Sequence, residues 1–218
     1  MTIPAIRRIV AVLIVTVSAA ACARQPQPLT GLAGSIEQAR RDSLRYAYTK
    51  ADIDFMSGMI SHHAQAIVMA KWAPTHGASA SVIRLTERII NAQTDEIAMM
   101  SRWLEDRRQP IPEANPKGMK MMMGGTEHVM AMPGMLTDAQ MAKLDAARNV
   151  EFDRYFLTYM IQHHRGAVAM VDQLFAARGA GQDETVFKFA NDVQIDQSTE
   201  IVRMAQMVLE IGGPAKEP

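Results

Sequence analysis

A twenty-residue stretch that occurs twice decides the fold of this protein. Residues 52–71 read DIDFMSGMISHHAQAIVMAK and residues 153–172 read DRYFLTYMIQHHRGAVAMVD, with eight of twenty positions identical. A second pattern follows each copy, since Gln93, Glu96, Ile97 and Met100 recur as Gln197, Glu200, Ile201 and Met204. Spacing of i, i+3, i+4 and i+7 puts each foursome on one face of a helix. These patterns predict that each half of the chain forms a helical hairpin.

Local signals place the ends of these helices. Helix breakers mark a turn inside each hairpin, at residues 74–77 and residues 179–181. Two sequences are typical of capping boxes, in which side chain and backbone cap a helix start reciprocally. They are Thr49 with Asp52 and Thr137 with Gln140. For Asp52 we prefer this capping role to a role in chemistry.

Two antiparallel hairpins with one apolar stripe each bury these stripes best against each other, as a four-helix bundle. No segment reads as a strand. We therefore predict an all-α protein in which residues 35–212 form one duplicated domain. The first hairpin occupies residues 35–109, a linker residues 110–136 and the second hairpin residues 137–212, with a tail at 213–218. Short extra helices are expected at about residues 35–47 and 138–148.

The N-terminus resembles an export signal. Arg7 and Arg8 precede a 13-residue apolar run, residues 9–21, which is too short to span a bilayer. Ala19-Ala20-Ala21-Cys22 then resembles a bacterial lipobox, with Cys22 as the lipidated residue. Ordinary cleavage after Ala21 is the alternative. We predict a signal peptide at residues 1–21, a tether at residues 22–34 and a location in the periplasm or cell envelope.

Composition excludes several classes of function. The 218 residues carry 23 Lys and Arg against 23 Asp and Glu, which argues against a broad nucleic-acid surface. A single Cys excludes a disulfide framework and any Cys-based zinc finger. The 18 methionines outnumber the 12 aromatic residues, so this excess of thioethers needs an explanation.

Histidine and methionine recur together on the repeated helix. Imidazole and thioether form a ligand set suited to copper, particularly Cu(I), and thioethers suit an oxidising envelope because they form no disulfides. We expect the duplication to bring Met59 with His62 or His63 close to Met160 with His163 or His164, as one pseudo-symmetric site. Glu96 and Glu200 would orient the imidazoles as outer acceptors. Met69 and Met170 are further candidates, although core packing is the more common role of such methionines.

The linker is the second candidate for metal binding. Its prolines and glycines predict a non-helical, exposed segment, yet it contains His128 and seven methionines: Met119, Met121, Met122, Met123, Met130, Met132 and Met135. A disordered tether is the alternative, but such segments are usually poor in large apolar residues. The composition favours capture of a soft metal.

Residues 152–167, with Phe156, Met160 and the His163-His164-Arg165-Gly166-Ala167 run, resemble the bacterial family of domain of unknown function 305. The first His-His copy and Met132-Pro133-Gly134-Met135 resemble its other half and its middle segment. The resemblance runs from about residue 48 to residue 212. It implies an exported, ferritin-like four-helix bundle, and some Met- and His-rich members are periplasmic copper-binding proteins.

Three functions compete. The first is an envelope protein that binds copper for buffering, tolerance or transfer, and that is not an enzyme. The second is a metal-free helical bundle that docks a protein partner. The third, a di-iron oxidase, requires Glu-x-x-His motifs, but Met59, Ile60, Met160 and Ile161 stand three residues before the histidines.

Overall fold

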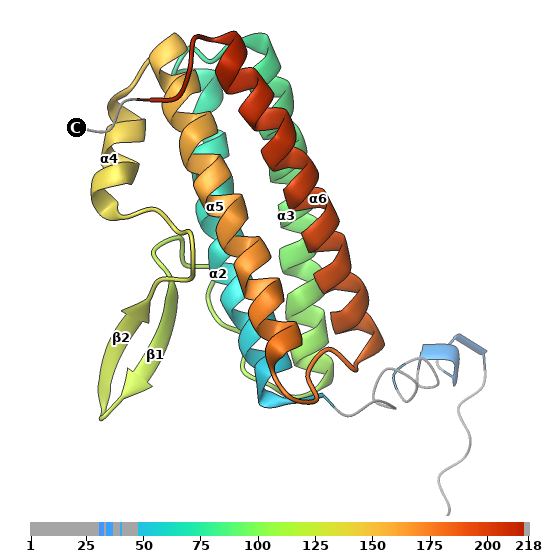
Figure 1. Ribbon diagram of the computed structural model, residues 1–218. Helices are drawn as coiled ribbons and strands as arrows, with labels where there is room; N and C mark the ends of the chain where they lie inside the picture. The colour runs from blue at the N-terminus through green and yellow to red at the C-terminus, as the bar shows by residue number, and fades with distance from the viewer. Residues whose placement is uncertain (1–30, 33, 37–39, 41–47, 216–218) are drawn as a thin grey trace, which may run out of the picture.

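The computed structural model describes residues 31–32, 34–36, 40 and 48–215, and most of this part of the chain is helical. The predicted signal peptide, Cys22 and most of residues 35–47 lie outside it. Its elements are α2 (Lys50–Lys71), η1 (Ala73–Thr75), α3 (Ala80–Asp106), β1 (Met119–Met123), β2 (Thr126–Met130), α4 (Asp138–Ala146), α5 (Val150–Ala176) and α6 (Glu184–Glu210) (Figure 1).

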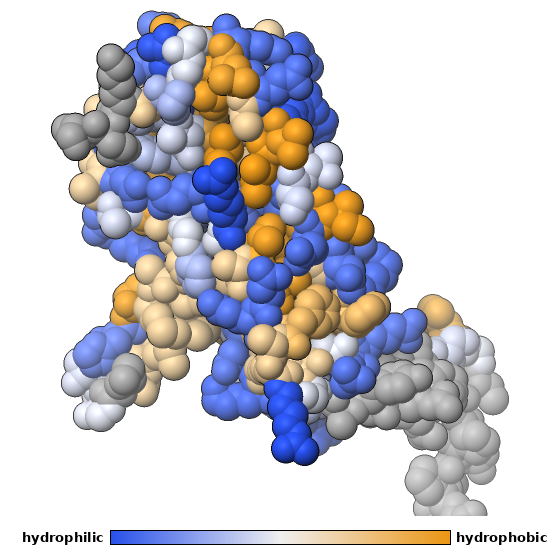
Figure 2. Space-filling model, viewed as in Figure 1, coloured by the Kyte–Doolittle hydropathy of each residue, from blue (hydrophilic) through white to orange (hydrophobic). Residues whose placement is uncertain are grey.

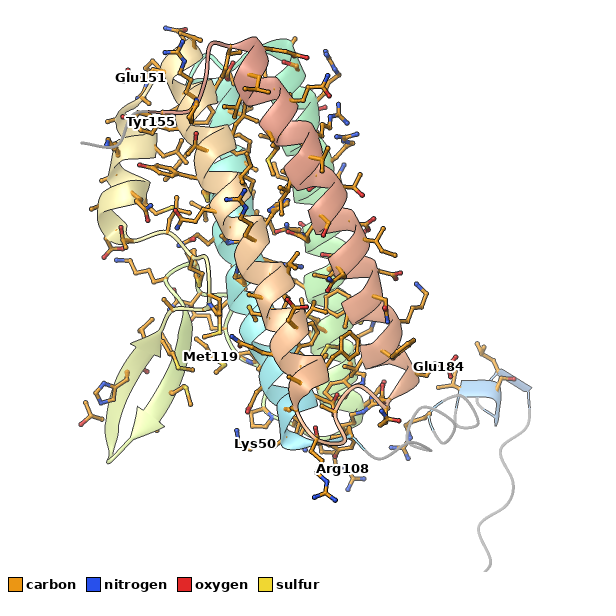
Figure 3. The ribbon with its side chains drawn as sticks, in the orientation of Figure 1. Lys50, Arg108, Met119, Glu151, Tyr155 and Glu184 are labelled. Atoms are coloured by element: carbon orange, nitrogen blue, oxygen red, sulfur yellow. The ribbon has the colours of Figure 1, made fainter. Side chains whose placement is uncertain are left out.

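The four long helices pack as two hairpins. Helix α2 packs against α3, α5 packs against α6, and α2 and α5 form the main contact between the two pairs. Helices α2 and α5 run in opposite directions, with Lys50 and Glu151 at opposite ends of the molecule (Figure 3). The middle of one repeat therefore lies beside the middle of the other.

The predicted capping boxes at Thr49 and Thr137 are both present. Asp52 does more than cap α2, because its Oδ1 also accepts a hydrogen bond of 2.7 Å from the Gly181 backbone in the α5–α6 turn. Its repeat equivalent, Asp153, accepts bonds of 3.2 Å from the Ser79 backbone at the end of the α2–α3 turn. Each hairpin thus holds the turn of the other.

The apolar core divides into two clusters. One lies toward the α2–α3 turn and includes Met69, Phe152 and Met160, and the other lies toward the α5–α6 turn and includes Phe55, Met59 and Met170. On both helices the paired histidines lie between the residues of one cluster and those of the other, after Ile60 and before Ala66 on α2 and after Met160 and before Ala167 on α5.

The linker contains two strands, so the prediction that no segment forms a strand was wrong. Strands β1 and β2 pair antiparallel in the register Met119 to Met130 and Met121 to His128. Gly124 and Gly125 connect them, both with positive φ (59° and 83°). Two such residues form the tight turn whose twist matches paired strands, so this Gly-Gly sequence was the missed signal. The linker is not exposed throughout either, because Met135 and Leu136 are buried.

Among the residues that the structure describes, no helix combines the length and apolar character needed to cross a membrane.

Candidate functional site: a histidine centre beside a methionine pocket

The four paired histidines lie midway along α2 and α5 and are completely buried. His62 and His163, which are equivalent in the two repeats, have ring centroids 3.8 Å apart at an interplanar angle of 36°. His63 and His164 lie farther out, with ring centroids 6.3 Å and 6.4 Å from those of their neighbours in sequence. We call these four residues the histidine centre.

A carboxylate from each outer helix reaches this centre. His164 Nε2 lies 2.7 Å from Glu200 Oε2 on α6 and is hydrogen-bonded to it. His63 Nε2 lies 2.6 Å from Glu96 Oε2 on α3, an ion-pair distance without good hydrogen-bond alignment. The structure therefore brings together both His–Glu pairs that the repeat suggested.

A third acceptor comes from the linker. His62 Nε2 lies 3.1 Å from the carbonyl oxygen of Pro133. A carbonyl can only accept, so the proton of neutral His62 must be on Nε2, which leaves the lone pair on Nδ1. The Nε2 atom of His164 likewise faces an acceptor, Glu200. A histidine that donates one N–H to a fixed acceptor is the usual state of a metal ligand.

The remaining imidazole nitrogens have no partner. Buried polar atoms are nearly always hydrogen-bonded, because each unmade bond costs about 1–3 kcal/mol. Here the buried Nδ1 atoms of His62, His63 and His164 have no hydrogen-bond partner, nor does either nitrogen of His163. Several ring nitrogens without a partner therefore lie together in one buried place.

The inner histidines are neutral. Burial, followed by the neighbouring His63, lowers the pKa of His62 to about 3. Burial, followed by the charges of His62 and His164, holds the pKa of His163 well below its usual value. Neutral imidazole is the form that binds metals, so near neutral pH these lone pairs are available without loss of a proton.

A pocket lined by methionines lies between the β-hairpin and α2 and α5. Its volume is about 260 Å³, and five thioethers contribute to its wall: Met119, Met121, Met130, Met132 and Met170. Met119 is on the side of β1 that faces the helices (Figure 3). Moderately hydrophobic residues, in tan, gather over this part of the surface (Figure 2). We call these five residues the methionine pocket.

The linker is fixed to the helices by residues that the sequence did not single out for this role. Gln65 Nε2 donates to the carbonyls of Pro116 and Leu136, both at 3.0 Å, and Gln65 Oε1 accepts from the Leu136 backbone at 2.7 Å. Gly134 lies directly on Gly166 of α5. A Cβ added at Gly166 would be 1.9 Å from the Pro133 carbonyl oxygen. Their roles depend on contacts between distant segments, so no local spacing marked them.

Several other predicted ligands do not come together in one site. Met59 and Met160 fall in different core clusters, as do Met69 and Met170. The two helices run antiparallel, and residues that precede equivalent histidines therefore point to opposite ends. His128 is exposed and Met122 is 69% exposed, whereas Met135 is buried. The side chain of Met123 and all of Cys22 lie outside the described residues.

Among the described residues, no three His, Cys, Asp or Glu side chains are close enough to hold one ion. A metal at the histidine centre would therefore need another kind of ligand or a small rearrangement. Thioethers are the other metal-binding groups nearby.

Comparison with known proteins places the chain in a family. The model of the domain of unknown function family DUF305 matches residues 52–208, whereas no curated protein sequence gives a match. A DUF305 protein from Streptomyces coelicolor is 30% identical, with a TM-score of 0.64 over 77% of this chain and 98% of the other. A DUF305 fragment from Deinococcus radiodurans is 27% identical, with a TM-score of 0.60 over 73% and 96%.

The protein CopM, solved in a Cu(I)-bound form, is 28% identical, with a TM-score of 0.57 over 77% of this chain and all of CopM. CopM has also been solved with Ag and with Cu(II). The family match spans well over half of the chain and includes both His-His repeats. This protein therefore belongs to the DUF305 family.

Proposed function

We propose that this protein binds copper as Cu(I), through imidazole and thioether ligands, to buffer the ion or pass it on. One observation carries the proposal. The histidine centre is a set of buried imidazoles with ring nitrogens that lack a hydrogen-bond partner, and three of these imidazoles have another ring nitrogen against an acceptor: Pro133, Glu96 or Glu200. This is the outer-partner arrangement of metal-ligating histidines.

The methionine pocket supports the choice of metal. Thioethers are soft, uncharged ligands that suit Cu(I), whereas hard cations prefer carboxylate and carbonyl oxygens. Five thioethers line this pocket, and its nearest carboxylate, Asp54, lies 2.6 Å from the ammonium group of Lys50. The pocket therefore favours a soft monovalent ion over Mg²⁺ or Ca²⁺.

The structural neighbours support copper at the level of the family, since CopM has been solved with copper bound in both oxidation states. We also infer that the two helix pairs descend from one duplicated hairpin and form a ferritin-like four-helix bundle. Equivalent contacts in the two halves, Asp52 to Gly181 and Asp153 to Ser79, support this view. Export, with a lipid anchor at Cys22, belongs to the same proposal.

Binding and release of copper require ligand exchange but no chemistry on the protein, so we propose a binding protein and not an enzyme. The competing proposal is a metal-free protein that docks a partner. It would leave the unpaired imidazole nitrogens without a purpose.

Anaerobic titration of Cu(I) against a chromophoric competitor tests the proposal. We expect wild type to compete, and His62→Gln/His163→Gln to lose affinity by at least about tenfold, since removal of even an outer partner of a metal ligand typically costs that much. Met119→Leu/Met121→Leu/Met130→Leu keeps apolar volume and should weaken a second binding event.

Met122→Leu is the matched control, because Met122 is exposed on the opposite face of β1 and outside the methionine pocket. It should bind as wild type does. A wild-type protein that does not compete for Cu(I), while circular dichroism shows it folded, would overturn the copper proposal and favour the partner-docking one.

A further inference from the structure

Gly58 gives two thioethers room against α2, one helical turn before His62. A Cβ at residue 58 would lie 2.8 Å from Met132 Sδ and 3.4 Å from Met170 Cε. A distance under 3.0 Å is a clash, so any larger residue would displace Met132 from this place. Met132 comes from the linker and Met170 from α5, and both therefore meet at Gly58.

These two methionines lie beside Gly58, four residues before His62 on α2, where the methionine pocket borders the helices. Both line the methionine pocket, at whose outer side Met130 is 46% exposed. Met170 is only 6% exposed, and His62 is completely buried. The residue after Met132 is Pro133, whose carbonyl oxygen contacts His62 Nε2. Burial thus increases stepwise from the hairpin, through Met132 and Met170, to His62.

We propose that Met132 and Met170 form a thioether relay site for Cu(I), through which an ion captured by the β-hairpin reaches His62 and His163. Gly58 is the residue that makes room for this site. The inference rests on the copper-binding function proposed above and adds the route that the ion takes. The transfer is an exchange of thioether for imidazole ligands, without oxidation, reduction or transfer of a proton.

The chemistry of the route explains why it carries a soft monovalent ion. Thioethers have no charge and no proton to lose, so Cu(I) can leave them for a stronger imidazole ligand. At the inner end, His62 and His163 have buried ring nitrogens that lack a hydrogen-bond partner. Met135 Sδ already accepts a hydrogen bond of 3.2 Å from the Met132 backbone, which holds Met132 in place.

Gly58→Ala tests the relay without breaking the fold. Alanine has a higher helix propensity than glycine, and the atoms that its Cβ would meet are the ends of flexible side chains. The variant should therefore fold and displace Met132. Ser57→Ala, a change of similar size on the adjacent residue, is the matched control.

The first measurement is NMR of methionine ε-methyl groups during titration with Ag(I), a soft ion without redox chemistry under these conditions. In wild type and Ser57→Ala we expect Met132 and Met170 to respond together with Met119, Met121 and Met130. In Gly58→Ala the hairpin methionines should still respond, whereas the response of Met132 and Met170 should be lost or strongly reduced.

The second measurement is the rate at which Cu(I) reaches the histidines after rapid anaerobic mixing. The absorbance of the competing chelator reports this rate. We expect Gly58→Ala to slow this step at least about tenfold, equal to about 1.4 kcal/mol in the barrier, with equilibrium affinity at the histidine centre unchanged. Equal rates and equal Met132 responses in Gly58→Ala and Ser57→Ala would overturn the relay alone. Absence of any methionine or histidine response in wild type would overturn the copper proposal itself.

Discussion

His62 and His163, equivalent residues of the two repeats, face each other at the centre of the molecule with ring centroids 3.8 Å apart. This contact follows from the antiparallel packing of α2 against α5. Only residues near the midpoint of both helices can meet their own equivalents in such a pair. The two turns held by Asp52 and Asp153 keep this alignment at both ends.

We predict that the metal-free protein loses stability as the pH falls below about 6.5. The pKa of His62 is lowered to about 3 by burial and by His63, and that of His163 is lowered for the same main reason. In the unfolded chain both histidines take up protons near pH 6.5, but in the folded protein they do not. Each therefore reduces the unfolding free energy by up to about 1.4 kcal/mol per pH unit, in the case of His62 down to about pH 3.

Urea unfolding from about pH 7 to about pH 4 measures this slope. His62→Gln/His163→Gln is the reference, because it lacks both groups and should show a shallower decline. Well above about pH 6.5 both histidines are neutral in the folded and in the unfolded protein, so they do not change the unfolding free energy with pH. Parallel curves for wild type and the double variant would show that these histidines are not the source of the pH dependence.

Loss of a carboxylate beside the histidine centre should weaken Cu(I) binding. Glu200→Gln keeps the shape of the side chain but removes the charge that His164 Nε2 contacts at 2.7 Å. We expect a decrease in affinity of about tenfold, at the low end of the effects of outer partners of metal ligands. Glu96→Gln should act in the same direction through His63.

Glu210→Gln, at the exposed end of α6, is the control for competitive titration. It removes the same charge far from the centre and should leave the affinity unchanged. If Glu200→Gln and Glu210→Gln bind equally well, then Glu200 has only a structural role.

Gly58 and Gly166 should respond oppositely to alanine. Glycine to alanine inside a helix ordinarily raises stability by about 0.5–1 kcal/mol. At Gly166, however, the new Cβ would lie 1.9 Å from the Pro133 carbonyl oxygen, a backbone atom that cannot swing away. We expect Gly166→Ala to lower the unfolding free energy by about 1–3 kcal/mol.

Thermal and urea unfolding of Gly166→Ala and Gly58→Ala side by side check this difference. Gly58 meets only side-chain ends, so its variant should be as stable as wild type or slightly more. A Gly166→Ala protein of unchanged stability would show that the linker does not pack on α5 as described.

We expect the hydrogen bonds of Gln65 to hold the linker against α2. Gln65→Ala removes three hydrogen bonds, to Pro116 and to both backbone groups of Leu136. It leaves buried backbone groups unpaired, which costs about 1–3 kcal/mol. Hydrogen exchange at the Leu136 amide should accelerate by a corresponding factor, whereas Gln206→Ala, on the exposed face of α6, should leave it unchanged. Equal protection in both variants would contradict the role of Gln65.

Much of the helical architecture could be predicted because its signals are local. The capping boxes at Thr49 and Thr137 and the breakers at residues 74–77 and 179–181 act within a few residues of their own position, and the structure places helix ends there. The β-hairpin was also encoded locally, in Gly124 and Gly125, but the long run of methionines hid its alternation. Two strands that short gain stability only by packing against helices.

The candidate site was likewise predictable only in part. The repeat alone singled out His62, His63, His163 and His164 and their partners Glu96 and Glu200, because equivalent positions on duplicated helices carry the same chemistry. Which histidines meet, which methionines fall in other clusters and where the linker lies were decided by the tertiary structure. Helical periodicity determines the face of each helix, but the direction and depth at which two helices pack arise only from contacts between residues far apart in the chain.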